Sequence, residues 1–422
     1  MQIKVIALFV IGLVLGFGLG YSAMPLLAPS PGATTTTTGK TEITIGGLFC
    51  TSGDAAAYGQ DIQASAQIAI DDLNTYLQSE GSNYHFTLVS EDTADTAEGS
   101  LKGITDLYQT KGITAFVGPG NSVEVGGLKA FSDANKLVVV AISSSDEYRI
   151  NDYIFRPFVI NGLTAPPIAD LIYAEGYRKV GGLYRDDSFG TDLFNIFAQE
   201  FQRLGGTVQG VKYTINLPDY ASEVAQLSSI ISGFGADDKT AVFHVTFEAD
   251  GLNIYGHAST DPVLSKVKWF GTTDSMRDAF LPPKAPTAIG DFLVKVDSTG
   301  LFPTSPVNPT YQKFAAEYKA KTGNAATGWG SNMYDLAWIL GLALVHTGGK
   351  TGDVLKTAVY EVTTHYIGSS GWKLVDQNGD LAVADFGVWH VTNQGGQYKY
   401  DFIKYYSGTS GQFTPWISGK YT

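Results

Sequence analysis

Apolar and polar residues follow two different periods along residues 42–74, and the change of period divides this stretch into two elements. Apolar Ile43 and Ile45 alternate with polar Thr44, and the apolar pair Leu48 and Phe49 follows. This is the pattern of a strand that enters a covered sheet. From Gln60 onward, apolar residues recur at the spacing of an amphipathic helix. The loop between them, SGDAAAYG at 52–59, joins a strand end to a helix start, where open α/β sheets bind ligands. We therefore expect this loop to form one wall of a binding site.

The same succession of strand, loop and helix continues along the chain. The next predicted elements are a strand at 85–92, a helix at 96–109, a strand at 113–117, a helix that ends at Asn135 and an apolar run at 137–145 that ends in three serines. Continuous apolar runs are typical of parallel strands buried on both faces. The alternation predicts the α/β class, with a doubly wound parallel sheet.

A second cycle of similar plan begins near Ile160. It contains predicted helices at 168–175 and 191–204 and a buried strand at 240–247, and a further strand ends at Gly271. A proline-rich passage at 281–309, two helices at 311–321 and 332–345, and a β-rich tail from Ile367 follow. With 422 residues and 44% hydrophobic residues, the chain is long enough for two lobes rather than one core.

The first 40 residues differ in composition from the rest. Residues 1–27 carry one lysine before an apolar run, which indicates a signal peptide or an N-terminal membrane anchor, and the sequence leaves these two alternatives open. Residues 28–40 are rich in proline and threonine, too polar to pack, and we interpret them as a tether. Together they predict a folded body held outside the cell membrane.

The net charge of −13 excludes a surface that follows nucleic-acid phosphates. Cys50 is the single cysteine, so no internal disulfide forms, and no Cys/His spacing predicts a metal site. Residues 376–380 (DQNGD) superficially resemble a calcium loop, but the distal glutamate is absent and a hairpin turn fits better. We expect neither metal nor cofactor.

Catalytic patterns are absent from the sequence. Ser122 lacks the G-x-S-x-G elbow because Glu124 replaces the second glycine, and His244 lies in an apolar run typical of a core histidine. The glycines of 118–120 are too few for a phosphate-binding loop. Hydroxyl-rich loops at strand ends remain, and they suit polar recognition without turnover. We predict that the chain is not an enzyme.

The export segment, the tether and four motifs resemble the branched-chain amino-acid type of extracellular solute-binding protein that serves ABC importers. The motifs are SGDAAAYG, VGPGNS, AISSS and LYRDDSFG. The resemblance extends from about Glu42 to the C-terminal region and implies two α/β lobes of the type I periplasmic-binding-protein fold, joined by three crossovers. It places the first lobe at 41–159 and 276–385, and the second at 160–275 and 386–422. The implied crossovers lie near 158–161, near 271–275 and in the tail.

The resemblance also implies the ligand-binding residues. In the first lobe, Tyr58 borders the ligand and Ser122 holds its carboxylate at a helix N-terminus, with further contacts from Asn121, Ser143, Ser144 and Ser145. In the second lobe, Phe189 and Phe247 supply an aromatic wall. Either Thr273 or Asp274 faces the ligand, and we favour Asp274 because an unpaired ammonium in a closed site is costly.

The implied function is capture of an amino acid or similar small carboxylate by lobe closure, followed by delivery to an ABC permease. A sensory ectodomain on the same fold and, less favoured, a secreted hydrolase are the alternatives. Neither the ligand nor the oligomeric state follows from the sequence.

Overall fold

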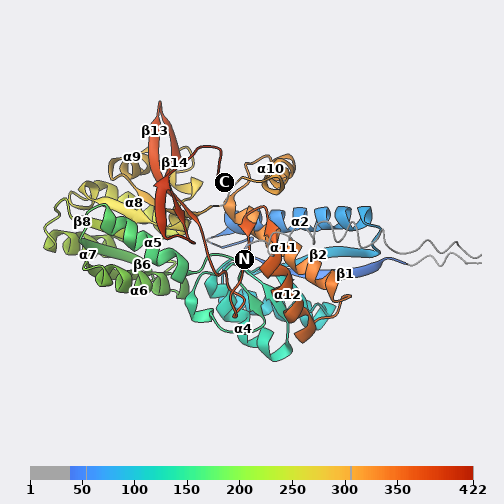
Figure 1. Cartoon of the computed structure of the whole chain (residues 1–422). Coiled ribbons are helices and arrows are strands. Elements are labelled where there is room, and N and C mark those ends of the chain that lie inside the picture. Colours follow the sequence, from blue (N-terminus) through green and yellow to red (C-terminus); the bar gives the residue numbers. More distant parts are fainter. Residues whose placement is uncertain (1–38, 54, 305–306, 422) are drawn as a thin grey trace, which may run out of the picture. The chain divides into compact units, whose positions relative to one another are not determined.

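The first sheet of the structure contains five parallel strands. The computed structural model describes residues 39–53, 55–304 and 307–421 (Figure 1). The strands are β1 (Thr41–Phe49), β2 (Tyr84–Asp92), β3 (Ala115–Val117), β4 (Val138–Val140) and β5 (Ile154–Phe155), in the order β2-β1-β3-β4-β5. The order confirms the parallel sheet that the apolar runs predict. The expected leader and most of the tether lie outside the described residues.

Helices of this lobe connect the strands or arrive from a later part of the chain. They are α2 (Ala56–Ser79), α3 (Ala97–Lys111), α4 (Ser122–Asn135), α10 (Pro309–Thr322), α11 (Gly328–His346) and α12 (Asp353–His365). The sequence sets several ends: the Thr96 side chain accepts a hydrogen bond from the Gly99 N–H, and Gly112 ends α3 in the left-handed conformation. Helix α11 packs along α2, so late residues complete the first lobe (Figure 1).

The second sheet has eight strands in the order β15-β14-β13-β10-β9-β8-β6-β7. Its parallel part is β6 (Lys179–Arg185), β7 (Thr207–Tyr213), β8 (Thr240–Val245), β9 (Lys268–Gly271) and β10 (Thr299–Pro303). Three antiparallel strands extend it: β13 (Phe386–Gln394), β14 (Gln397–Ser407) and β15 (Gln412–Pro415). Its helices are α5 (Asn161–Ala174), α6 (Ser188–Arg203), α7 (Ala221–Gly233), α8 (Glu248–Thr260) and α9 (Thr287–Lys295). The β-rich tail is therefore confirmed.

The middle crossover lies later in the chain than the sequence indicates. Strand β10 pairs with β9 on one side and with β13 on the other, so Thr299–Pro303, expected in the first lobe, lie in the second sheet. Its short TGLFP sequence has too little alternation to reveal a strand. Helix α9 lies inside the proline-rich passage at 281–309, where no helix was predicted, and α12 was not predicted either. Residues 41–422 form one compact unit, and the bounds of the two lobes as separate domains stay a prediction.

The two sheets share a topology that locates the binding edge. In the first sheet the strand order switches sides between β1 and β3, and in the second between β6 and β8, while the strands themselves stay parallel. Ligands of open α/β sheets bind outside the carboxyl ends of the strands, at the point where the strand order switches sides. The segments after these four strands carry Tyr58, Asn121, Ser122, Phe189 and Phe247, and those after β4 and β9 carry the three serines and Thr273 with Asp274. Among the described residues, no helix is both long and apolar enough to cross a membrane.

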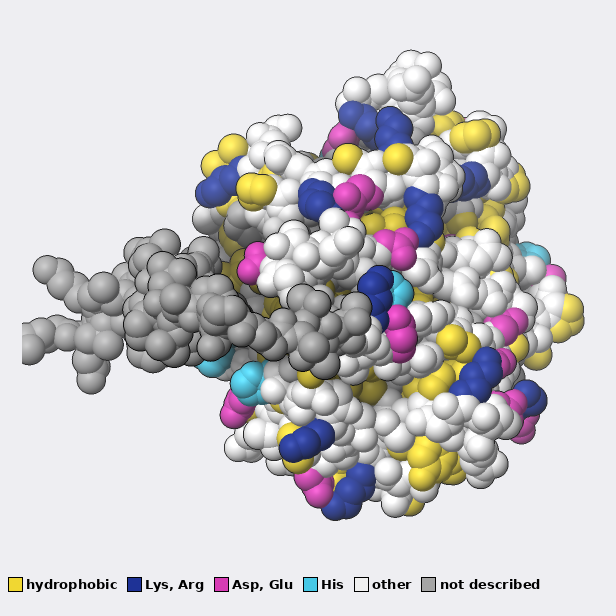
Figure 2. Space-filling model, turned by 90° about the vertical axis from the view of Figure 1, so that its right-hand side faces the viewer, with side chains coloured by type: hydrophobic (Ala, Val, Ile, Leu, Met, Phe, Trp, Pro, Cys, Tyr) yellow, Lys and Arg dark blue, Asp and Glu magenta, His cyan; other side chains and the backbone are white. Residues whose placement is uncertain are grey.

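The surface carries charges of both signs. Figure 2 shows Lys and Arg side chains interspersed with Asp and Glu on the face it presents. On that face the basic and acidic side chains are mixed rather than gathered by sign.

Candidate functional site

The floor of the candidate site is the loop from β3 into α4. Gly118 has a φ of +84° and a Cβ there would lie 2.2 Å from the Leu48 carbonyl oxygen, so only glycine fits. Asn121 caps α4: its side-chain oxygen accepts from the Glu124 N–H over 3.0 Å, and its amide nitrogen donates to Asp95 over 2.6 Å. The cap fixes the direction of the helix start, where Ser122 is the first helical residue.

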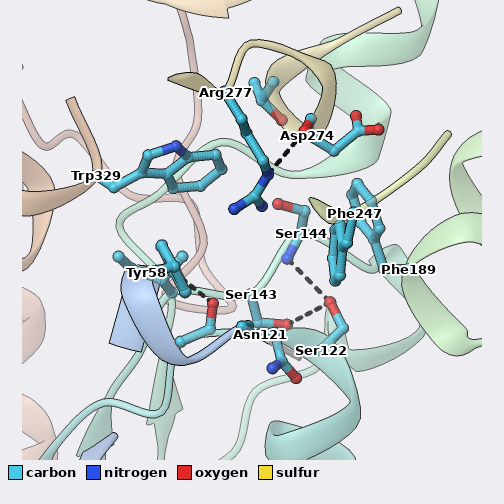
Figure 3. A pocket seen from close by; sticks show the side chains of 14 residues that line it. Tyr58, Asn121, Ser122, Ser143, Ser144, Phe189, Phe247, Asp274, Arg277 and Trp329 are labelled. Atoms are coloured by element: carbon cyan, nitrogen blue, oxygen red, sulfur yellow. Dashed lines mark hydrogen bonds between the residues drawn. The ribbon is translucent and has the colours of Figure 1, made fainter. Parts of the chain in front are cut away.

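The Ser122 hydroxyl is hydrogen-bonded to the turn of three serines that follows β4. Its Oγ accepts hydrogen bonds from the Ser143 hydroxyl at 3.1 Å, the Ser144 N–H at 3.2 Å and the Ser145 N–H at 3.1 Å. The backbone N–H groups of Ser122 and Val123 belong to the first turn of α4, where no intrahelical acceptor exists. Free N–H groups and the helix dipole favour an anion at this point. The floor therefore suits a carboxylate (Figure 3).

Glu124 supports the floor from below and is fully buried. Its carboxyl group accepts from the Thr93 hydroxyl and, over 3.2 Å, from the Gly120 N–H. Burial raises the pKa of Glu124 to about 8, against an ordinary value of 4.5. This acid lies outside the pocket lining, so we assign it to the support of the loop rather than to ligand contact.

Aromatic side chains from both lobes form the walls. Tyr58 donates a hydrogen bond to the Gly120 carbonyl oxygen over 2.7 Å and meets Trp329 edge to face, with ring centroids 5.3 Å apart. Trp329, at the start of α11, also stacks on Phe158 at 5.4 Å. Opposite them, Phe189 and Phe247 stack at 5.6 Å. The pocket thus lies between two aromatic walls, one from each lobe (Figure 3).

Arg277 brings a positive charge between these walls. Its guanidinium carbon lies 5.1 Å from the Phe247 ring centroid, 5.7 Å from that of Tyr58 and 5.8 Å from that of Trp329. Its Nε donates to the Asp274 carbonyl oxygen over 2.8 Å, and Nη1 lies 3.5 Å from a Glu248 carboxylate oxygen. Two aromatic rings of the first lobe and one of the second therefore surround one cation of the second lobe.

Asp274 lines the pocket, but its carboxylate is turned toward its own lobe. It accepts from the Thr246 N–H over 2.9 Å, from the Thr272 hydroxyl and from the Ser275 hydroxyl over 3.1 Å. Burial raises the pKa of Asp274 above its ordinary value, and these hydrogen bonds oppose the rise. The role of ammonium partner stays a prediction for Asp274, and this geometry gives it no support.

The structure brings all the predicted site residues except Ser145 to one pocket. Its lining is Ala55, Tyr58, Gly120, Asn121, Ser122, Ile142, Ser143, Ser144, Phe189, Phe247, Thr273, Asp274, Arg277 and Trp329. Ser145 is fully buried: its Oγ accepts from the Glu147 N–H and caps a short 3₁₀ turn. Sequence reasoning missed Arg277 and Trp329; the signals were a basic residue three positions after Asp274 and a tryptophan between two glycines.

One group of potential metal ligands exists among the described residues. Cys50, Asp95 and Glu124 each place one ligand atom within 4.8 Å of the others. Thr93 and Gly120 already donate to Glu124, and burial raises the pKa of the Cys50 thiol, which opposes the thiolate that a metal requires. We interpret the group as structural.

The described lining of the pocket does not combine a nucleophile with a histidine base. None of the described residues that line it is a histidine. His244 is fully buried, its Nδ1 lies 3.3 Å from the Tyr255 hydroxyl, and burial lowers its pKa to about 3. It is a core histidine, as its apolar surroundings in the sequence predict.

Comparisons with known proteins agree with this geometry. The model of a family described as periplasmic binding protein matches residues 42–395. An uncharacterized protein of Methanocaldococcus jannaschii is 26% identical over 385 residues, which cover 86% of this chain and 90% of that protein.

Two solved structures illustrate the likeness in fold. The leucine-binding protein LivK of Thermotoga maritima has a TM-score of 0.69 and 18% identity, and the match covers 85% of this chain and 97% of that one. A solute-binding protein of an ABC transporter from Rhodopseudomonas palustris, in complex with 3,4-dihydroxybenzoic acid, also has a TM-score of 0.69 and 18% identity, with 87% and 98% covered. They confirm the predicted two-lobed α/β fold of the type I periplasmic-binding-protein kind.

Proposed function

Because the chain belongs to the periplasmic binding protein family, whose members hold a solute without turning it over, we propose that it captures a small organic carboxylate for an ABC importer. Its residues would bind and enclose the ligand and leave every covalent bond intact. The predicted amino-acid ligands are one form of this class.

The observation that carries the proposal is the Ser122 hydroxyl at the start of α4. It lies at the bottom of a pocket formed by the carboxyl-end loops of both sheets, beside N–H groups that have no intrahelical acceptor. A carboxylate would accept hydrogen bonds from these N–H groups and from the Ser122 hydroxyl. Phe189, Phe247, Tyr58 and Trp329 would enclose the rest of the ligand.

The ligands of two neighbours support the same class. The Thermotoga maritima neighbour is a leucine-binding protein, and the Rhodopseudomonas palustris neighbour holds 3,4-dihydroxybenzoic acid. Leucine and dihydroxybenzoic acid share a carboxylate and differ in almost everything else. The two neighbours would then share a site for the carboxylate in the first lobe and would differ in the wall that the second lobe supplies.

Closure and delivery complete the proposal. Ligand binding would favour the closed arrangement of the lobes because only that arrangement offers contacts from both walls. A membrane permease would then receive the closed form. Residues 1–27 would direct export or anchor the chain, and residues 28–40 would act as the tether that holds the body outside the cell.

Isothermal titration with matched acids and carboxamides tests the proposal. The probes are benzoate with benzamide and leucine with leucinamide. We expect at least one acid to bind with 1:1 stoichiometry while its amide does not, because the amide lacks the negative charge that the helix start favours. Amides that bind as tightly as their acids would contradict the carboxylate anchor, and consumption of the ligand would contradict a receptor.

A further inference from the structure

The charges inside the pocket have an unequal distribution. Among the described lining residues, Arg277 is the one basic side chain and Asp274 the one acidic side chain. Asp274 directs its carboxylate to three donors of its own lobe, and the guanidinium of Arg277 projects between the aromatic walls (Figure 3). A ligand in this space therefore meets a cation and no outward carboxylate from the second lobe.

One short hydrogen bond holds the Arg277 side chain in this position. Its Nε bond to the Asp274 carbonyl oxygen, at 2.8 Å, fixes the guanidinium plane. Its other contact with an acid is the Glu248 oxygen at 3.5 Å, which is the upper limit for a hydrogen bond and weak. Because the side chain is nine-tenths buried, its charge is poorly screened and acts strongly on any ligand beside it.

An ammonium group and this guanidinium repel each other. An α-amino acid carries its ammonium one carbon away from the carboxylate, so a carboxylate seated at Ser122 would bring the ammonium into the same small pocket as Arg277. No free carboxylate from the lining would compensate the ammonium, and an uncompensated buried charge is costly. An acid without the ammonium avoids this repulsion.

The walls indicate the shape of the preferred acid. On one side Tyr58 and Trp329 lie edge to face, with 83° between their planes, and on the other Phe189 and Phe247 are stacked at 24°, so both sides offer aromatic surface. Planar rings pack well against such surfaces and gain further from edge-to-face contacts. A branched aliphatic side chain gains only the burial of its area.

We propose that the pocket selects small aromatic carboxylates that lack an ammonium group, and that Arg277 is the residue that sets this selection. The inference rests on the proposed function, since it names the ligand class of the same site. Arg277 excludes amino acids through its charge and attracts an anionic or oxygen-bearing end of the ligand.

A pair of ligands that differ only in the ammonium tests the inference: 3-phenylpropanoate and phenylalanine. For the parent protein, calorimetry should give a dissociation constant about 10- to 100-fold lower for 3-phenylpropanoate, the range expected for interactions with a charged group. In Arg277→Gln the ratio should fall toward one, and in Arg277→Glu it should reverse. Arg178→Gln is the matched control, because Arg178 also stacks on an aromatic ring of the second lobe but does not line the pocket.

The outcomes separate the two proposals. Phenylalanine that binds at least as tightly as 3-phenylpropanoate would overturn the selection and leave the carboxylate receptor intact, as would a ratio that Arg277→Gln does not change. If no carboxylate binds the parent protein, the proposed function itself fails. Circular dichroism and thermal unfolding of each variant must match the parent, and Arg277→Lys, which keeps the charge, should keep the preference.

Discussion

The Nε atom of Arg156 donates a hydrogen bond to Oδ1 of Asp380 over 2.7 Å, and both side chains are only 1% exposed. Arg156 follows β5, next to the first crossover, and Asp380 ends the DQNGD turn of the tail. Arg156 also donates to the Ser145 carbonyl oxygen, in the turn that Ser122 organises. Asp380 of the DQNGD turn therefore forms a buried ion pair beside the site. The hydrogen bonds within the turn support the hairpin interpretation over a calcium loop.

Replacement of Asp380 should be strongly destabilising. In Asp380→Asn the Arg156 guanidinium stays buried without its counter-charge, and loss of one partner of such a pair costs about 3–5 kcal/mol of unfolding free energy. Urea unfolding followed by circular dichroism measures the change. Asp106→Asn, which removes an exposed pair with Lys102, is the control and should barely move the midpoint. Equal midpoints for the two variants would contradict a structural role for the buried pair.

Stability should also depend on pH through Glu124. Its folded-state pKa of about 8 lies above the ordinary 4.5, so the folded protein keeps a proton that the unfolded chain has released between these values. The contribution of Glu124 to stability is therefore fully present below about pH 4.5 and is lost as the pH rises through about 8. Glu124→Gln should flatten this part of the curve of unfolding free energy against pH.

Urea unfolding at a series of pH values measures that curve. The exposed α3 residue Glu98 offers the control, Glu98→Gln, whose curve should follow that of the parent. A Glu124→Gln curve that keeps the parent slope would show that Glu124 does not titrate in this range.

Loss of the Ser122 hydroxyl should affect both binding and stability. In Ser122→Ala the ligand carboxylate loses one donor, and the Ser144 and Ser145 N–H groups lose their shared acceptor. We expect weaker binding of carboxylates by about 1–3 kcal/mol, measured by calorimetry. Ser132→Ala removes another buried hydroxyl of α4, bonded to the Leu137 carbonyl oxygen, and should change stability without changing affinity. Unchanged affinity in Ser122→Ala would remove this hydroxyl from the site.

Parallel-sheet topology explains why much of the site was predictable. The carboxyl ends of β1, β3, β4, β6 and β8 meet along one pocket, so loops recognised locally as strand ends brought Tyr58, Ser122, Phe189 and Phe247 together. Ser145 does not line the pocket, because its side chain caps the 3₁₀ turn that begins one residue later. Only the turn geometry distinguishes it from its two serine neighbours.

The parts of the site that the sequence did not reveal depend on tertiary packing. Trp329 reaches the pocket because α11 packs along α2, far away in sequence. The direction of the Asp274 carboxylate is set by the Thr246 N–H of a neighbouring strand end, which no local pattern encodes. Because that carboxylate points into its own lobe, the charged side chain that reaches the pocket from this segment is Arg277, where the sequence analysis expected an acid.

Asp274→Asn tests whether the Asp274 carboxylate supports its own lobe or pairs with an ammonium group of the ligand. If the Asp274 carboxylate supports only its own lobe, the variant should lose about 1–3 kcal/mol of stability and should weaken 3-phenylpropanoate and phenylalanine to the same extent. Parallel titrations with the two ligands measure this. A selective loss of phenylalanine would contradict the structural role and would identify Asp274 as the partner of an ammonium group.

Recovery of the bound solute tests the central claim most directly. The protein would be saturated with the acid that binds best in the titrations, freed of excess ligand, incubated, and then denatured for mass spectrometry of the released small molecules. A receptor that encloses a carboxylate without chemistry predicts one unchanged acid per chain at every incubation time. Release of a chemically altered product, or recovery far below one per chain after saturation, would contradict the account.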